Sequence, residues 1–132
     1  MQKKKLYLAA PSLRVCKPAT AIVYYIRLDF KDGLALYKIG YTSMTIVKRV
    51  EGYYDRRTRS YKGGMGLPAT CRYKIIGVVY RGSKARAYVE EQRLHKLYQA
   101  YRYNGSKLVR NGHSELYLVD VLGLDVDRRL VI

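Results

Sequence analysis

The 132-residue sequence contains no tryptophan, one phenylalanine and only two cysteines. Cys16 and Cys71 lie far apart and form no Cys-x-x-Cys motif, which argues against a zinc ribbon or a disulfide-stapled secreted module. The apolar run Leu6 to Ala10 is too short for the core of a signal peptide, and no segment is long enough to cross a bilayer. We therefore expect a cytoplasmic protein without a membrane segment.

Acidic residues are also scarce, because 10 Asp and Glu stand against 26 Lys and Arg, giving a formal net charge of +16. Such an excess attracts polyanions and releases counterions on phosphate binding, so nucleic acid is the favoured partner. The basic residues run from Lys3 to Arg129 and do not gather on one amphipathic helix, which disfavours a membrane surface. The 15 tyrosines could stack on bases, although most are expected to pack in the core.

The length fits one compact domain. We expect a basic arm or extra strand over residues 1–20, the main domain over 21–120 and a tail over 121–132. Apolar and β-branched runs predict strands from Ala21 to Leu28, Leu34 to Tyr41 and Cys71 to Tyr80. An Asp-Gly turn at residues 29–33 joins the first two into a hairpin. The expected fold class is α/β, of the α+β type, with a small central antiparallel three-stranded sheet flanked by helices.

Helical periodicity predicts two helices. The first spans Ser43 to Tyr54, and the second begins at Ser83 as N-cap and runs to about Tyr101. The segment 55–70 is predicted to be a basic, mobile loop, residues 104–114 a polar loop and residues 115–119 a short strand. The apolar stripe of the second helix is expected to comprise Ala85, Val89, Leu94, Leu97 and Tyr101.

Six polar residues fall where the predicted hairpin and the two helices would converge: Tyr24, Lys38, Arg49, Glu91, His95 and Glu115. Helical spacing aligns Glu91 with His95 beside the apolar face, whereas Glu90 falls on the presumed buried side. The helical wheel alone leaves both glutamates open as metal ligands.

Five short motifs in order resemble the GIY-YIG endonuclease superfamily, in particular a compact branch found in phages and bacteria. They are Ile-Val-Tyr-Tyr-Ile around Tyr24, Tyr-Lys-Ile-Gly-Tyr-Thr around Lys38, Lys48-Arg49, Glu91-Gln-Arg-Leu-His95 and Ser114-Glu115-Leu-Tyr. Together they cover about residues 22–119. The first motif lacks its glycine, and Lys38 replaces the first tyrosine of the second motif.

The resemblance implies a metal-dependent endonuclease that hydrolyses phosphodiester bonds of double-stranded DNA with Mg²⁺ or Mn²⁺. It assigns the general base to Tyr24, whose hydroxyl has an ordinary pKa of about 10, and neighbouring Lys38 would favour the phenolate. Arg49 would neutralise charge on the phosphate. Glu91 is the implied metal ligand, preferred over Glu90, and Glu115 would either support the metal or orient Lys38. His95 would position water or phosphate, and Tyr53 would serve as an auxiliary proton-relay residue.

Each of these residues also has a plainer structural interpretation, such as a solvated arginine, a packed tyrosine or a surface ion pair. The resemblance makes the basic loop, with Arg56, Arg57, Arg59 and Lys62, a contact for the DNA backbone. One small site cuts one strand per encounter, so a double-strand break would require a homodimer or successive nicks. The alternatives are a catalytically inactive DNA- or RNA-binding module on the same scaffold and a basic ribosome-associated protein.

Overall fold

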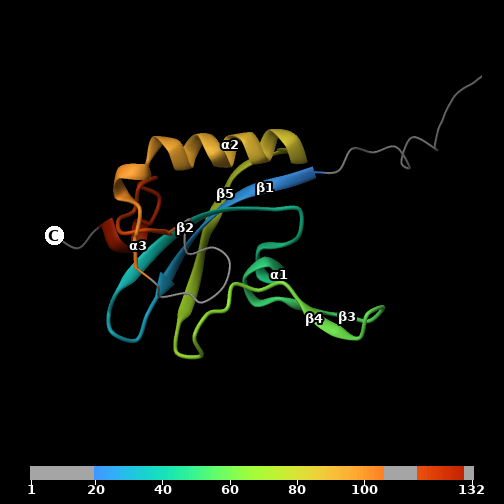
Figure 1. Ribbon diagram of the computed structural model, residues 1–132. Coiled ribbons are helices and arrows are strands. Elements are labelled where there is room, and N and C mark those ends of the chain that lie inside the picture. The colour runs from blue at the N-terminus through green and yellow to red at the C-terminus, as the bar shows by residue number, and fades with distance from the viewer. Residues whose placement is uncertain (1–19, 106–115, 130–132) are drawn as a thin grey trace, which may run out of the picture.

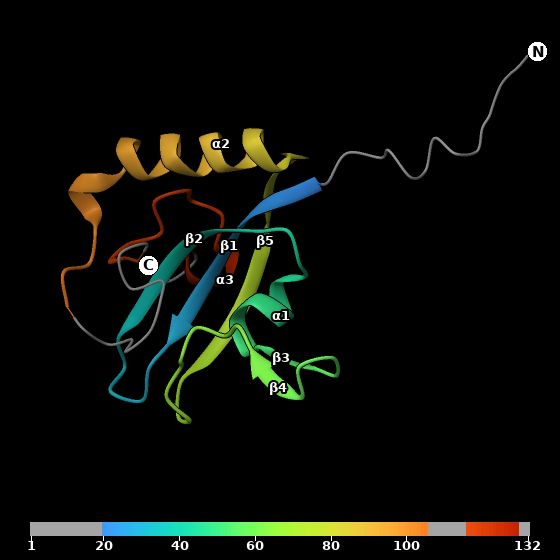
Figure 2. The same cartoon turned by 45° about the vertical axis from the view of Figure 1, so that its right-hand side comes forward.

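A computed structural model describes residues 20–105 and 116–129, which form an antiparallel sheet with helices packed against it (Figures 1 and 2). The sheet has the strand order β5-β1-β2-β6. Its strands are β1 (Thr20–Asp29), β2 (Ala35–Thr42), β5 (Arg72–Ser83) and β6 (Leu116–Tyr117). The predicted α+β class is confirmed. The short strand β6 lies within the strand predicted over residues 115–119 and joins the three expected strands as the fourth strand of the sheet.

The β1–β2 hairpin closes at the predicted Asp-Gly turn. The Asp32 carboxylate accepts a hydrogen bond from the backbone nitrogen of Leu34 at 3.0 Å, and Gly33 adopts a φ of +92°. Glycine occupies this left-handed region without steric cost. The turn therefore sets the register in which Tyr24 lies opposite Gly40 and Ile26 opposite Lys38.

Alternate residues of the strands build two separate cores on the two faces of the sheet. One face is covered by α1 (Ile46–Glu51) and the glycine-rich segment after it, and the other by α2 (Lys84–Leu97). The core on the α1 face comprises Ile22, Tyr24, Ile26, Leu28, Phe30, Leu36, Val50, Met65 and Leu116. The core on the α2 face comprises Ala21, Val23, Tyr25, Tyr37, Ile39, Ala87, Leu94 and Tyr117.

The second helix begins where the sequence predicts. The Ser83 hydroxyl caps α2 by accepting a hydrogen bond from the backbone nitrogen of Arg86 at 3.2 Å. The α-helix ends at Leu97, and the short 3₁₀ helix η2 (Gln99–Tyr101) continues the chain to the predicted end.

The predicted apolar stripe of this helix is wrong except for Leu94. Val89, Leu97 and Tyr101 are more than half exposed, and Ala85 is exposed as well. Compared with the predicted orientation, the helix is rotated about its axis, and a different set of side chains faces the sheet. This set comprises Ala87, Glu91, Leu94 and His95. Two polar side chains thus share the buried face, a choice that hydrophobic periodicity cannot anticipate.

The first helix is shorter than predicted, because the chain leaves it at Gly52. Gly52 has a φ of +86°, and Tyr53 begins a strand. The prediction of helix to Tyr54 is therefore wrong, and the segment predicted as a loop over residues 55–70 contains strand residues at 55 and 60–62 between its irregular parts. The strands β3 (Tyr53–Asp55) and β4 (Ser60–Lys62) form a hairpin that projects from the domain on the side away from α3 (Figure 1).

The C-terminal segment packs onto the α2 face through a buried carboxylate. Asp125 accepts hydrogen bonds from Arg27 Nη1 at 2.8 and 3.1 Å and from the Tyr37 hydroxyl at 2.7 Å. Burial alone would raise the pKa of Asp125, but these hydrogen bonds outweigh it and hold the pKa below its ordinary value. The short helix α3 (Val126–Arg129) follows directly.

Replacing Asp125 with asparagine is expected to lower the free energy of unfolding at pH 7 by about 3 kcal/mol, because Arg27 loses its buried partner. The folded-state pKa lies below the unfolded one, so the stabilisation is present above the ordinary aspartate pKa of about 4. It is lost as the pH falls through the lowered folded-state value. Urea melts at several pH values measure this. Asp127→Asn, at an exposed partner of Lys74, is the control, and equal loss in both variants would contradict the account.

Some predictions lie outside the described residues. They concern residues 1–19 of the expected arm, Glu115 and the polar loop over residues 106–114. Within the described ranges, no helix is both long and apolar enough to cross a membrane.

Candidate active site

Tyr24 and Lys38 meet on the α1 face of the sheet. Both side chains are fully buried, and Lys38 Nζ lies 5.8 Å from the centroid of the Tyr24 ring. Ile26, which pairs with Lys38, is the next residue of β1 on this face. The fold therefore places the Lys38 amine beside the Tyr24 phenol inside the core of this face and not at a solvent-exposed position.

Gly40 makes room for the Tyr24 side chain. A Cβ atom at Gly40 would lie 2.2 Å from Tyr24 Cζ and 2.3 Å from its hydroxyl oxygen, far inside van der Waals contact. Its φ is not in the left-handed region, so glycine is required here for space and not for backbone conformation. The third residue of the Lys-Ile-Gly motif thus fixes where the phenol lies.

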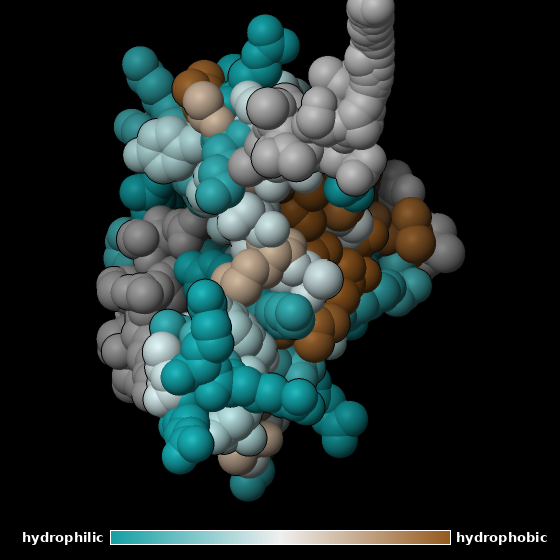
Figure 3. All heavy atoms as spheres, turned by 90° about the vertical axis from the view of Figure 1, so that its right-hand side faces the viewer, coloured by the Kyte–Doolittle hydropathy of each residue, from teal (hydrophilic) through white to brown (hydrophobic). Residues whose placement is uncertain are grey.

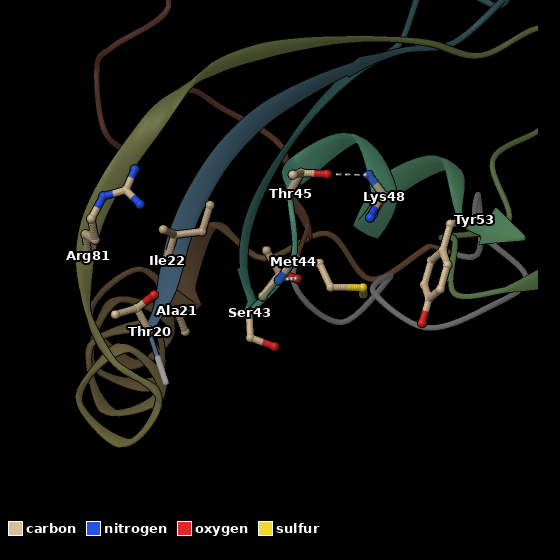
Figure 4. Close-up of a pocket in the computed structure, with 10 residues that line it drawn as sticks. Thr20, Ala21, Ile22, Ser43, Met44, Thr45, Lys48, Tyr53 and Arg81 are labelled. Carbon is tan, nitrogen blue, oxygen red and sulfur yellow. Dashed lines mark hydrogen bonds between the residues drawn. The ribbon is translucent and has the colours of Figure 1, made fainter. Parts of the chain in front are cut away.

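A pocket of about 660 Å³ opens at the end of the same row of residues (Figure 4). Ile22 and Thr42 line it, and this pair precedes the Tyr24–Gly40 pair in the register of β1 and β2. Two residues along a strand span about 7 Å, so the pocket lies one step from the phenol. The other lining residues are Thr20, Ala21, Ser43, Met44, Thr45, Lys48, Tyr53 and Arg81.

The pocket is basic and rich in hydroxyl groups. Figure 4 shows Arg81 of β5 on one side and Lys48 of α1 with Tyr53 of β3 on the other. Lys48 Nζ lies 5.7 Å from the centroid of the Tyr53 ring. Two cations with hydroxyl donors around a cavity of this kind suit an anion such as a phosphodiester.

Glu91 and His95 form a second buried group, on the helix that covers the other face. Their side chains are 6% and 8% exposed, and Glu91 Oε2 lies 3.5 Å from His95 Nε2. His95 Nδ1 is hydrogen-bonded to the Tyr117 hydroxyl, and the two rings are stacked at 5.8 Å. The sheet separates this group from Tyr24 and Lys38. Leu116 of β6 pairs with Lys38 and packs in the α1-face core, whereas the next residue, Tyr117, packs on the α2 face and contacts His95.

Glu90 and Glu91 are separated clearly by their surroundings. Glu90 is paired with Arg93 at 2.7 Å on the solvent side, and this hydrogen bond lowers the pKa of Glu90. Glu91 faces the sheet, opposite to the orientation that the helical wheel suggested.

The remaining predicted residues lie around α1 and the β3–β4 hairpin. Arg49 is half-buried on α1, between Lys48 of the pocket and Val50 of the core, and does not itself line the pocket. Arg56, Arg57 and Arg59 are exposed at the tip of the hairpin. Lys62 forms an ion pair with Asp55 at 3.1 Å.

A family model described as the T5orf172 domain matches residues 21–130. The chain belongs to the T5orf172 domain family. This family is related to GIY-YIG nuclease-like domains, which agrees with the resemblance seen in the motifs. No curated protein and no solved structure matches the chain significantly.

A divalent metal is implied by the nuclease relatives of the T5orf172 domain, and a carboxylate such as that of Glu91 is the kind of ligand that such an ion prefers. A buried carboxylate with an imidazole 3.5 Å away offers a hard oxygen ligand and a supporting nitrogen. Among residues 20–105 and 116–129, no group of three or more His, Cys, Asp or Glu side chains could enclose a metal. Glu91 is itself only 5% exposed, so the described residues do not by themselves form a metal site.

Two residues of this T5orf172 domain were not anticipated as site residues, namely Lys48 and Arg81. Lys48 precedes Arg49, and only the arginine was assigned a role. Arg81 lies near the end of β5, one residue beyond the strand predicted from Cys71 to Tyr80. Their common pocket depends on the pairing of β5 with β1, which places Arg81 opposite Ile22. A single sequence carries no signal for that convergence.

Proposed function

We propose that this T5orf172 domain is a metal-dependent endonuclease that hydrolyses phosphodiester bonds of double-stranded DNA. The observation that carries the proposal is the buried Tyr24–Lys38 pair, one register step from a basic pocket. An amine and a phenol buried side by side differ from the apolar side chains that make up most of the surrounding core, and burying polar groups is costly. Family membership supports the same chemistry.

The pocket binds the scissile phosphodiester. Arg81 and Lys48 approach it from two sides and offset its charge, while hydroxyl groups such as that of Thr45 line the remainder. Arg49, half-buried on the same helix as Lys48, neutralises the additional charge that develops on phosphorus during attack. Tyr53 assists as a proton relay at the rim of the pocket.

Tyr24 is buried one register step from the pocket, so in this proposal the proton of the attacking water reaches it through the hydroxyl groups that line the pocket. The Lys38 ammonium stabilises the negative charge of the phenolate that accepts this proton. A bond forms between the water oxygen and phosphorus, the bond from phosphorus to the leaving deoxyribose oxygen breaks, and that oxygen takes up a proton from solvent water. Gly40 supports the step by keeping the ring of Tyr24 against the sheet.

Glu91 would hold Mg²⁺ or Mn²⁺, with His95 orienting its carboxylate and Glu115, beyond the described residues, as a further ligand. When bound, the ion supplies charge stabilisation for the phosphate and its leaving group. The Tyr117 hydroxyl fixes the His95 ring through Nδ1 and so keeps Nε2 directed to Glu91. One such site cuts one strand, so a double-strand break requires a homodimer or successive nicks.

The two adjacent glutamates of α2 provide the test of the metal assignment. We expect Glu91→Gln to lower the rate of Mg²⁺-dependent plasmid nicking by about 100-fold, since a neutral amide binds the ion poorly. Glu90→Gln, which removes only a solvent-side ion pair with Arg93, should nick within about two-fold of wild type. Circular dichroism melts check the fold of both variants. If Glu91→Gln nicks as fast as Glu90→Gln, Glu91 holds no catalytic metal.

A further inference from the structure

Two tyrosines form an exposed ring pair on the β3–β4 hairpin. Tyr54 and Tyr61 lie opposite each other in the two strands, with ring centroids 5.2 Å apart and planes inclined by 66°. Tyr54 is 50% exposed and Tyr61 80% exposed. The pair packs only partly against the domain and presents aromatic surface to solvent.

The other face of the same hairpin is occupied differently. Tyr53 lines the pocket, and Lys62, its partner across the hairpin, forms the ion pair with Asp55. Because successive strand residues point to opposite faces, the hairpin directs Tyr53 to the pocket and the Tyr54–Tyr61 pair away from it. The face of the molecule toward which the hairpin projects is largely hydrophilic in its lower part (Figure 3).

The tip of the hairpin is an ordered turn that carries three arginines. Asp55 Oδ1 accepts a hydrogen bond from the backbone nitrogen of Arg57 at 2.9 Å, and the hydroxyls of Thr58 and Ser60 are 2.9 Å apart. Arg59 has a φ of +53°, a left-handed conformation that is strained for a side chain and that glycine would adopt freely. Arg59 thus adds a third charged side chain to the tip, beside Arg56 and Arg57.

The base of the hairpin is fixed to the domain. A Cβ atom at Gly52 would lie 2.9 Å from the backbone oxygen of Lys62, so the two strands approach closely there. Beyond β4, the fully buried Met65 donates its backbone N–H to the oxygen of Val50 at 3.0 Å. The ring pair is therefore held in place before any ligand binds, which lowers the entropic cost of binding.

We propose that the Tyr54–Tyr61 pair is a stacking platform for unpaired DNA bases, with Arg56, Arg57 and Arg59 holding the adjacent phosphates. Arginines alone would bind any DNA backbone, but an exposed ring pair gains a partner only where bases are unstacked. The preferred substrate is thus DNA with a single-stranded segment beside the duplex at the pocket. The choice of DNA as ligand rests on the nuclease function proposed above.

Binding is measured by fluorescence anisotropy in EDTA, with a labelled single-stranded oligonucleotide and with the duplex of the same sequence. Tyr61→Ala should weaken single-strand binding about 10-fold and leave duplex binding within about two-fold. Tyr61→Trp should restore single-strand affinity, and Tyr61→Thr, which retains strand propensity, should behave as Tyr61→Ala. The control is Tyr88→Ala, at a tyrosine of α2 that is 52% exposed and far from the hairpin in sequence.

Arg57→Ala should lower affinity for both DNA forms and reduce the salt dependence of binding by about one unit of slope. Equal losses for both DNA forms in Tyr61→Ala, or no loss in either, would overturn the platform. Because no metal is present, this result is independent of cleavage. Wild-type protein that prefers single strands through Tyr61 but nicks no DNA would overturn the nuclease proposal alone.

Discussion

Replacing Tyr24 with phenylalanine is expected to slow DNA nicking by about 100-fold or more while leaving the affinity for DNA unchanged. The substitution removes only the hydroxyl and keeps the ring that fills the space over Gly40. The proton of the attacking water then loses its acceptor beside Lys38. Single-turnover kinetics with protein in excess over DNA measure the chemical step separately from binding.

The neighbouring residue offers a matched control for this experiment. Tyr25 is equally buried on the same strand, but it faces α2, and its hydroxyl donates a hydrogen bond to Asp120 at 2.6 Å. Tyr25→Phe is expected to cost about 1 kcal/mol of stability and to leave the single-turnover rate within about two-fold of wild type. A similar loss of rate in both variants would mean that hydroxyls of β1 matter only for the fold.

Gly40→Ala is expected to destabilise the domain by about 3 kcal/mol and to lower its melting temperature by roughly 10 °C. The added methyl group would overlap the Tyr24 ring, which is enclosed in the core and has no free direction in which to move. Thermal melts followed by circular dichroism measure the effect. Gly77→Ala in β5 is the control, since a Cβ atom there meets nothing within 4 Å.

A double variant distinguishes this overlap from a general intolerance of alanine. Combining Gly40→Ala with Tyr24→Leu removes the clashing ring atoms, so the two changes should be less destabilising together than the sum of their separate effects. Strict additivity, or equal melting of Gly40→Ala and Gly77→Ala, would contradict the packing described for Tyr24.

The elements with strong local signals were predicted from the sequence. The β-branched run before Asp29, the Asp-Gly turn and the Ser83 cap each act within a few residues, so their positions can be read without tertiary information. The positions of Tyr24 and Lys38 on one face of the hairpin could also be predicted. The turn fixes the register of the two strands, and the two-residue period of a strand then decides which side chains share a face.

The features that were wrong or missed depend on tertiary contacts. The end of α1 at Gly52 and the β3–β4 hairpin follow from close packing between Gly52 and Lys62. In the observed orientation of α2, Val89 is exposed and Glu91 is buried, the reverse of what the apolar periodicity suggested. Tyr117 of the sheet hydrogen-bonds His95, which in turn lies beside Glu91, and these polar contacts could not be read from the sequence. The pocket needs Arg81 to arrive from β5, which no local pattern specifies.

The central claim is that this T5orf172 domain cuts DNA, and the most direct measurement is nicking of supercoiled plasmid by the purified wild-type protein. The account predicts conversion to the open-circular form in Mg²⁺ or Mn²⁺, none in EDTA, and none with Tyr24→Phe over the same period. Wild-type protein that retards the plasmid on a gel but leaves it supercoiled in both metals would contradict the account and identify a DNA-binding module.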